Sequence, residues 1–413
     1  MMTHPTLSPS RELGLLLAIA GIQFTHILDF MIMMPLGPQF TRLFGINDAQ
    51  FGLLVSAYTL SASVSGLAAA TYVDRFDRKH LLLTLYVLFA LATLACGFAP
   101  DYGLLMVARV AAGLFGGVLS ALAQTIVADV VPFERRGRAM AIVMSSFSVA
   151  TVAGVPAGLF LASHLSWHAP FIAIAGLCAL LLVAAALTLP RLGHHLGHGH
   201  RPSVWRGIAQ VLVDRNHQRA FVFSALLMVT GFTMLPFITL YMQANVGLLP
   251  QQIPYLYLAG GLATLFTARW IGRLTDRLGK RRMFAIMALA VIVPMLMTTL
   301  LPPWPLWAVL MVSTALFISM SGRMIPGMAL VTGAAAPALR GTFMALNASV
   351  QSAAMGLASL VGGLIIGRDA QGQLTHYWVC AVLGGLASLA ALALSRRVRV
   401  HTATAVPGAP AGA

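Results

Sequence analysis

Long apolar segments recur along the whole sequence, and each, as a helix, would be about long enough to cross a lipid bilayer. We identify twelve of them, at residues 14–36, 51–73, 81–99, 103–128, 139–163, 168–190, 219–244, 253–272, 283–301, 305–332, 341–366 and 377–395. A helix needs roughly 20 apolar residues to cross the hydrocarbon core, whereas barrel strands are alternating segments of about 10 residues. The pattern therefore predicts an all-α integral membrane protein with twelve transmembrane helices.

The charged residues indicate how these helices are oriented. They make up only 9% of the chain, whereas soluble domains carry about 25%. With the N-terminus in the cytoplasm, 21 of the 26 basic residues fall in cytoplasmic segments, two (Arg42 and Arg368) fall outside, and three (Arg109, Arg269 and Arg323) fall within spans. This positive-inside pattern explains the net charge of +15 without a nucleic-acid partner. We expect a protein of the cell (inner) membrane with both termini in the cytoplasm.

A charged loop occurs twice in the chain, each time at the end of an apolar segment and 202 positions apart. The later and clearer copy contains Gly272, Asp276, Arg277, Gly279 and Lys280. The earlier copy contains Asp74, Arg75 and Arg78, with Ala70 and Asp77 where the later copy has glycines. Together with matches between the fourth and tenth segments and between the fifth and eleventh, this repeat predicts a duplicated body.

The repeat divides the chain into domains. We predict two six-helix bundles, residues 1–190 and 219–400, joined by a cytoplasmic linker at 191–218 that is rich in His and Arg. Residues 401–413 have the Ala, Gly and Pro content of a disordered tail. Parallel repeats favour a substrate site near the membrane midplane, between the bundles. One group of linker histidines either binds a metal or belongs to a flexible connection: His194, His195, His198 and His200.

Four motifs carry a family resemblance: the repeated loop, Arg109-Val-Ala-Ala-Gly113, Gly154-Val-Pro156-Ala-Gly158, and an acid followed by a proline at Asp29 and Pro35. With them the chain resembles the major facilitator superfamily over essentially its whole length. It is most similar to the branch of twelve-span drug/proton antiporters and sugar-efflux proteins. One departure is that Val155 separates Gly154 from the proline, which differs from the antiporter signature.

The resemblance implies roles for two of these motifs and an oligomeric state. Gly154, Pro156 and Gly158 would bend the fifth span and limit leakage, because proline removes a hydrogen-bond donor and glycine allows another helix to approach. The two charged loops would hold a cytoplasmic gate shut when the cavity faces outward; alternatively, they only anchor the topology. Members of the family usually act as monomers.

Asp29 is the only acidic residue well inside a predicted span. A charge at the bilayer centre costs roughly 2.5–3.5 kcal/mol on insertion scales, so such a residue usually faces a cavity and a partner. We expect Asp29 to carry the coupling proton, with Arg109 as its counter-charge and His26, one helical turn away, on the same face. The alternative for each residue is a hydrogen bond that only holds helices together.

Polar residues in other spans are candidates for the substrate cavity. Arg323 has no acid in the spans of its own half and would attract an anionic or strongly polar substrate, unless it binds backbone opened by Pro326. The remaining candidates either line the cavity or join helices: Asn347, Gln351, Tyr58 and Ser61.

These features predict a secondary active transporter, with proton-coupled efflux (antiport) of a small organic compound, such as a drug or a sugar, by alternating access. A proton symporter or uniporter that imports a metabolite remains the alternative. We see no P-loop, paired carboxylates or nucleophile triad, so an enzyme is not expected. The three cysteines lie in apolar spans without metal-ligand spacing. The expected partners are the substrate, protons and the bilayer, with the proton gradient as energy source and no cofactor.

Overall fold

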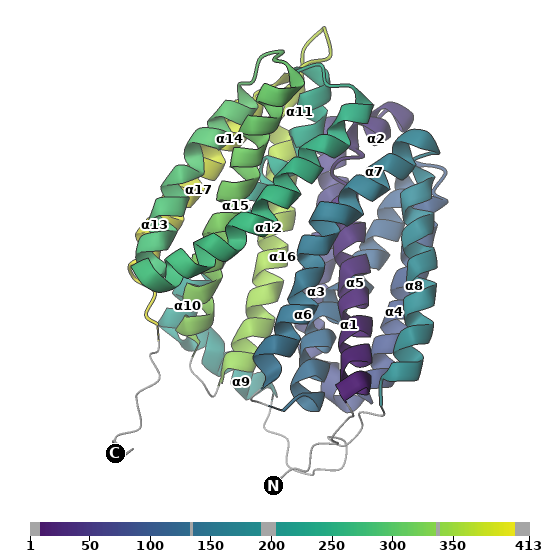
Figure 1. The fold of residues 1–413 in the computed structure, drawn as a ribbon, viewed down its shortest axis with the longest axis vertical. Helices are drawn as coiled ribbons and strands as arrows, with labels where there is room; N and C mark the ends of the chain where they lie inside the picture. The colour runs from purple at the N-terminus through teal and green to yellow at the C-terminus, as the bar shows by residue number, and fades with distance from the viewer. Residues whose placement is uncertain (1–8, 133–134, 191–203, 336–338, 401–413) are drawn as a thin grey trace.

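The structure, a computed structural model, describes residues 9–132, 135–190, 204–335 and 339–400. It consists of long helices that run side by side in two bundles (Figure 1). The N-terminal bundle contains α1 (Pro9–Ile32), α2 (Gly37–Leu43), α3 (Asp48–Tyr72), the short 3-10 turn η1 (Val73–Arg75), α4 (Arg78–Gly97), α5 (Tyr102–Val130), α6 (Arg136–Val149), the π-helical turn η3 (Ala150–Gly154), α7 (Val155–His164) and α8 (His168–Thr188).

The C-terminal bundle follows a short helix and ends in a helix preceded by a small hairpin. Its elements are α9 (Val204–Val213), α10 (Arg215–Phe232), η5 (Leu235–Phe237), α11 (Ile238–Ala244), η6 (Pro250–Gln252), α12 (Ile253–Leu278), α13 (Lys280–Ala290), α14 (Ile292–Thr299), α15 (Leu306–Ala334), α16 (Arg340–Ile365), β1 (Gly367–Arg368), β2 (Leu374–Thr375) and α17 (Tyr377–Ser395). The two strands pair antiparallel, with Arg368 opposite Leu374.

The prediction of twelve helical spans in two six-helix bundles is confirmed. Among the described residues, eleven helical segments are long and apolar enough to cross a membrane. The remaining predicted span corresponds to α12, which is 26 residues long and carries more polar side chains. Three spans are interrupted, because α6 and α7, α10 and α11, and α13 and α14 each form one crossing in two pieces. A proline lies at or just after each break: Pro156, Pro236 and Pro294.

Acidic and amide side chains fix where several helices begin. Asn47 Oδ1 accepts a hydrogen bond from the backbone N–H of Gln50, and Gln50 Oε1 accepts one from the backbone N–H of Asn47, which forms a capping box at α3. Asp101 caps α5 and Asp214 caps α10, because their carboxylate oxygens accept hydrogen bonds from backbone N–H groups in the first turn of each helix. Each cap satisfies backbone donors that have no partner inside the helix.

The linker between the bundles is described only in part. Residues 191–203, with their histidine cluster, and the predicted tail at 401–413 lie outside the described residues. From Val204 the chain forms α9, whose Val211 packs into the core of the C-terminal bundle. α10 begins at Arg215, four residues before the predicted start of the seventh span.

The two ends of the molecule differ in how the bundles meet (Figure 1). We call the end with residues 73–79 and 278–282 the loop-motif end, and the end with β1 and β2 the hairpin end. α3 and α16 pack against each other across the bundles. In the part of the chain that the structure describes, three pairs of residues form hydrogen bonds between the bundles: Asp48 with Arg368, Arg42 with Gln243, and Ser63 with Ser349. The first two pairs lie at the hairpin end, which is therefore closed.

Candidate functional site

A buried ion pair lies in the N-terminal bundle between α1 and α5. Arg109 Nη1 donates to Asp29 Oδ2 at 2.8 Å and to the backbone oxygen of Asp29 at 3.3 Å. Both side chains are 0% exposed. Since an unpaired charge in such a place is strongly unfavourable, each residue is the other's main electrostatic partner. The sequence candidates for proton coupling, which lie 80 positions apart, are thus in direct contact.

The pair is held in place by the close approach of α5 to α3. A side chain at Gly113 would come within 2.2 Å of the backbone oxygen of Tyr58, so the two helices pack this tightly only because residue 113 has none. Tyr58 in turn places its ring under Arg109, with the guanidinium carbon 4.5 Å from the ring centroid. This cation–π contact stabilises the positive charge of Arg109 in addition to its hydrogen bonds with Asp29.

A chain of hydrogen bonds leads away from the ring of Tyr58. Ser120 Oγ gives its single hydrogen to Gln23 Oε1 at 3.0 Å, so it must accept a hydrogen from His26 Nε2 at 3.2 Å. A neutral His26 with its hydrogen on Nε2 accepts at Nδ1, where the hydroxyl of Tyr58 lies at 2.6 Å and donates. His26 therefore fixes the position of Tyr58. Sequence reasoning missed Ser120 and Gln23, because neither residue belongs to a motif.

Arg323 is the second deeply buried arginine and lies in α15 of the C-terminal bundle. Its Nη2 atom donates to the backbone oxygen of Leu227 in α10 at 2.8 Å and to the sulfur of Met320 at 3.4 Å. Within the described chain, its Nε and Nη1 atoms have no hydrogen-bond partner. The backbone that it binds belongs to α10 and is not the turn opened by Pro326, which corrects one of the two interpretations drawn from the sequence.

The other cavity candidates are divided between two helices. In α16, Asn347 is buried and Gln351 is half-buried, with Gln351 Nε2 3.2 Å from the sulfur of Met328. In α3, the hydroxyl of Ser61 donates to the backbone oxygen of Tyr58 in its own helix at 2.9 Å. Ser61 Oγ also lies 2.1 Å from the place of a side chain at Gly113, so Ser61 lies in the contact between α3 and α5, whereas the two amides lie in the C-terminal bundle.

The cluster of Gly154, Pro156 and Gly158 lies where the fifth span changes from a π-helical turn back to an α-helix. A side chain at Gly154 would come within 2.9 Å of Leu28, and one at Gly158 within 2.6 Å of Ile32. The small residues therefore let the fifth span pack closely on α1, on both sides of the buried acid. The π-helical turn also contacts α12 of the other bundle.

The first copy of the charged loop makes its contacts inside the N-terminal bundle. Arg78 forms an ion pair with Asp129 near the end of α5. Lys79 Nζ donates to two backbone oxygens at the end of α8, at 2.8 and 2.6 Å. Arg75 is exposed, and the side chain of Asp74 lies outside the described part of the structure. This copy thus joins α4 to its neighbours α5 and α8.

The second copy turns sharply and points its charges to the surface. Gly279 has a φ of +86°, a conformation that side chains rarely allow, and it separates α12 from α13. Asp276, Arg277 and Lys280 are exposed around this turn, and Gly272 is half-buried one turn earlier. Both copies lie at the loop-motif end, away from the closed hairpin end.

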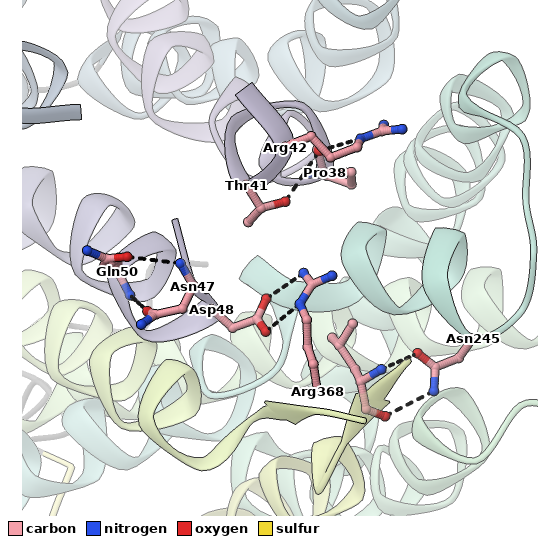
Figure 2. A network of polar contacts seen from close by, with 9 residues as sticks. Pro38, Thr41, Arg42, Asn47, Asp48, Gln50, Asn245 and Arg368 are labelled. Carbon is pink, nitrogen blue, oxygen red and sulfur yellow. Dashed lines mark hydrogen bonds and ion pairs between the residues drawn. The ribbon is translucent and has the colours of Figure 1, made fainter. Parts of the chain in front are cut away.

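Sequence reasoning missed an ion pair that closes the hairpin end (Figure 2). Arg368 in β1 donates from Nε and Nη2 to the two carboxylate oxygens of Asp48, at 2.9 and 2.8 Å. These hydrogen bonds raise the pKa of Arg368 above its usual value, so its charge is retained. Asn245 holds the hairpin in place by a reciprocal pair of hydrogen bonds with the backbone of Leu374. One signal was available in the sequence: Arg42 and Arg368 are the two basic residues that the predicted topology places outside the cell, where it places few basic residues.

Comparison with known proteins then identifies the family. The model of the Major Facilitator Superfamily matches residues 19–233 and again residues 220–412, which together span nearly the whole chain. The chain belongs to the major facilitator superfamily. The resemblance drawn from the sequence is thereby confirmed, and the protein is a multi-pass membrane transporter of this superfamily.

Individual relatives are distant. The chain is 30% identical to the inner membrane transport protein YdhP of Escherichia coli (strain K12) over 195 residues, 47% of this chain and 48% of that protein. The match thus spans about half the length of that relative. It is 26% identical to the chloramphenicol resistance protein of Streptomyces lividans, over 86% of this chain and 89% of that protein. The crystal structure of a D-xylose-proton symporter shares the fold, with a TM-score of 0.76 and 17% identity, over 93% of this chain and 97% of that one.

Membership of this superfamily indicates the general function of the protein. Its members move small molecules across membranes by means of helical bundles such as these. In the described ranges, no group of three or more His, Cys, Asp or Glu side chains could hold a metal ion.

Proposed function

We propose that this major facilitator transporter couples the entry of protons to the efflux of a small organic compound. The observation that carries the proposal is the Asp29–Arg109 ion pair, in which both side chains are 0% exposed. A carboxylate in this position has two stable conditions, ionised beside Arg109 or neutral after gaining a proton. The ionised carboxylate attracts the guanidinium group of Arg109 more strongly than the neutral carboxyl group does. Protonation of Asp29 therefore weakens its interaction with Arg109. This is the property that a coupling site requires.

The state of the bundles supports export from the cytoplasm. The distribution of basic residues favours a cytoplasmic loop-motif end, so a molecule closed at the hairpin end is closed to the outside. In this state the ion pair is formed, which corresponds to a carboxylate that has already released its proton inward. The similarity to a chloramphenicol resistance protein also favours efflux. Similarity to an inner membrane transport protein favours the inner membrane as its location. We propose that the chain acts as a monomer.

The cycle then uses residues of the N-terminal bundle in defined roles. When the bundles rock and the outside opens, Asp29 takes up a proton, and Arg109 keeps its contacts with the Tyr58 ring and with the backbone oxygen of Asp29. When the inside opens, Asp29 loses the proton and the ion pair forms again. His26, through its bond to the Tyr58 hydroxyl, keeps the ring beneath Arg109 in both states. The charged loops, including Arg78 and Arg277, would close the loop-motif end in the other half of the cycle.

The test compares the wild-type chain with Asp29→Asn in cells that overproduce each protein. Growth and efflux are measured with a neutral, an anionic and a cationic drug (chloramphenicol, nalidixate and ethidium), with and without a protonophore. We expect protection by the wild type that the protonophore abolishes, and none by Asp29→Asn. The matched control is Asp101→Asn, an exposed cap that asparagine replaces well. Full protection by Asp29→Asn would rule out this coupling site, and uptake of the drugs would favour import.

A further inference from the structure

Arg323 is a buried charge that forms no ion pair within the described part of the chain. The C-terminal bundle contains three acidic residues, Asp214, Asp276 and Asp369, and they lie at the N-cap of α10, at the end of α12 and in the hairpin. Arg323 lies near the middle of α15 and is 3% exposed. Arginine stays charged under all conditions that a cell provides. Ionisable residues inside membrane-spanning segments often mark the path of a substrate or ion, which makes Arg323 a candidate for contact with the substrate.

Other polar groups in the same part of the bundle also lack partners. Asn347 in α16 is 1% exposed and Ser224 in α10 is 0% exposed. In the described residues, Asn347 Oδ1 and Ser224 Oγ form no hydrogen bond, like Arg323 Nε and Nη1. Ser224 lies one turn before Leu227, the residue of α10 that Arg323 contacts, and Asn347 lies one turn before Gln351 in α16. Both α15 and α16 pack against α10. Buried polar groups usually have partners, so this group of orphans is unusual for a purely structural contact.

The geometry of the guanidinium group selects the chemistry of the partner. Its N–H groups form two edges, each with a parallel pair of hydrogens, and Nη2 contributes one hydrogen to each edge. The backbone oxygen of Leu227 occupies one hydrogen of Nη2, and the other hydrogen-bond partner of Nη2 among the described residues is the sulfur of Met320, a weak acceptor. One complete edge is therefore available to a planar anion. A carboxylate matches such an edge with two parallel hydrogen bonds.

The surroundings indicate what the carboxylate is attached to. Gly231 lies beside Arg323, since a side chain there would come within 3.6 Å of Nη2. The next residue, Phe232, faces Phe30 of the N-terminal bundle, with ring centroids 6.0 Å apart. Phe30 adjoins Asp29, so aromatic side chains connect the surroundings of Arg323 to those of the proton-coupling pair. This arrangement suits a molecule with one anionic group and an apolar body.

From these contacts, we propose that Arg323 binds the carboxylate of an organic acid, which is the exported substrate, and that Phe232 and Phe30 contact its apolar body. The assignment rests on the proposed function, because it names the substrate class of the same transporter. It adds a specificity residue in the C-terminal bundle to the coupling residues in the N-terminal one.

The experiment measures binding to the purified, full-length protein without any gradient. Three carboxylates (hexanoate, benzoate and 1-naphthoate) are compared with their uncharged amides by calorimetry and thermal shift. We expect at least one acid to bind roughly tenfold or more tightly than its amide, and Arg323→Gln to abolish that difference. Arg323→Lys should retain a weaker preference, because lysine keeps the charge but not the paired N–H groups. No preference for any acid, or an unchanged preference in Arg323→Gln, would overturn the assignment.

Two controls separate this assignment from misfolding and from the coupling proposal. Arg269→Gln removes an exposed arginine from α12 and should leave the preference for acids unchanged. Elution of each variant as a single species in size-exclusion chromatography establishes that it is folded. Asp29→Asn should still bind the acid but lose gradient-driven efflux. If instead the wild type binds acids through Arg323 and the protonophore does not change its efflux, the proposal of proton coupling is wrong and the proposal of the anion site is retained.

Discussion

Replacing Asp48 by asparagine should open the hairpin end. The carboxylate of Asp48 accepts two hydrogen bonds from Arg368 across the bundles, at 2.9 and 2.8 Å. The pair exists only while the two bundles touch at the hairpin end, so its full free energy contributes to the closed state and none of it to the open state. Asparagine preserves the shape of the side chain, but it removes the negative charge and one of the two acceptor oxygens.

The magnitude follows from the exposure of the two partners. Hydrogen bonds to charged groups contribute about 1.5–3 kcal/mol each when buried. The Asp48 side chain is 4% exposed but that of Arg368 is 36% exposed, so solvent screens the pair and Arg368 can reach water after the change. We therefore expect a loss of about 1–2 kcal/mol from the closed state. This raises the ratio of open to closed molecules roughly 5- to 30-fold.

The assay is a distance measurement by double electron–electron resonance. Spin labels are placed at Leu43 in α2 and Gln371 in the hairpin, which are exposed on opposite bundles. The native cysteines are buried and should not react. The control is Arg42→Gln, because the 3.5 Å contact of Arg42 with Gln243 is long and exposed; its effect should be less than about twofold. An unchanged distance distribution in Asp48→Asn would refute the latch, as would an equal effect of Arg42→Gln.

Two further changes test the construction of the coupling site. Gly113→Ala places a carbon 2.2 Å from the backbone oxygen of Tyr58, so α3 and α5 must separate. We expect the free energy of unfolding, measured by thermal or chemical denaturation, to fall by about 1–3 kcal/mol. An unchanged melting temperature would contradict this packing. His26→Leu removes the hydrogen bonds to Tyr58 and Ser120, whereas His26→Gln can keep one of them. Proton-driven efflux should therefore fall roughly tenfold in the leucine variant and less in the glutamine variant. Equal activity of the leucine and glutamine variants would show that these bonds do not position the ring.

Much of the fold could be predicted because the bilayer restricts the solutions. Apolar segments of bilayer length have to be helices, and the repeat of the Asp276 loop at Asp74 implied two similar bundles. The pairing of Asp29 with Arg109 was also a natural expectation, because the spans of the N-terminal half contain one acid and one arginine. In each case a strong energetic penalty leaves few alternatives.

Features that depend on close tertiary contact were not predictable. Asp48 and Arg368 are 320 positions apart, and neither lies in a motif. Their contact follows from how α3 packs on α16 and from the β hairpin, which has only two residues in each strand. The bend near Pro156 was expected, but the π-helical turn before it was not, because a glycine or proline marks a weak point in a helix without specifying the hydrogen-bond pattern.

The separation of Asp29 and Arg323 into different bundles has an electrical consequence. In the proposed cycle each residue binds its own ion, so the incoming proton and the outgoing carboxylate would each contribute to the charge moved per cycle. A proton that enters and an anion that leaves both carry positive charge inward, so one exchange moves two elementary charges. At a membrane potential of 100 mV this amounts to about 4.6 kcal/mol per cycle. The membrane potential would then drive export even where the pH is equal on the two sides.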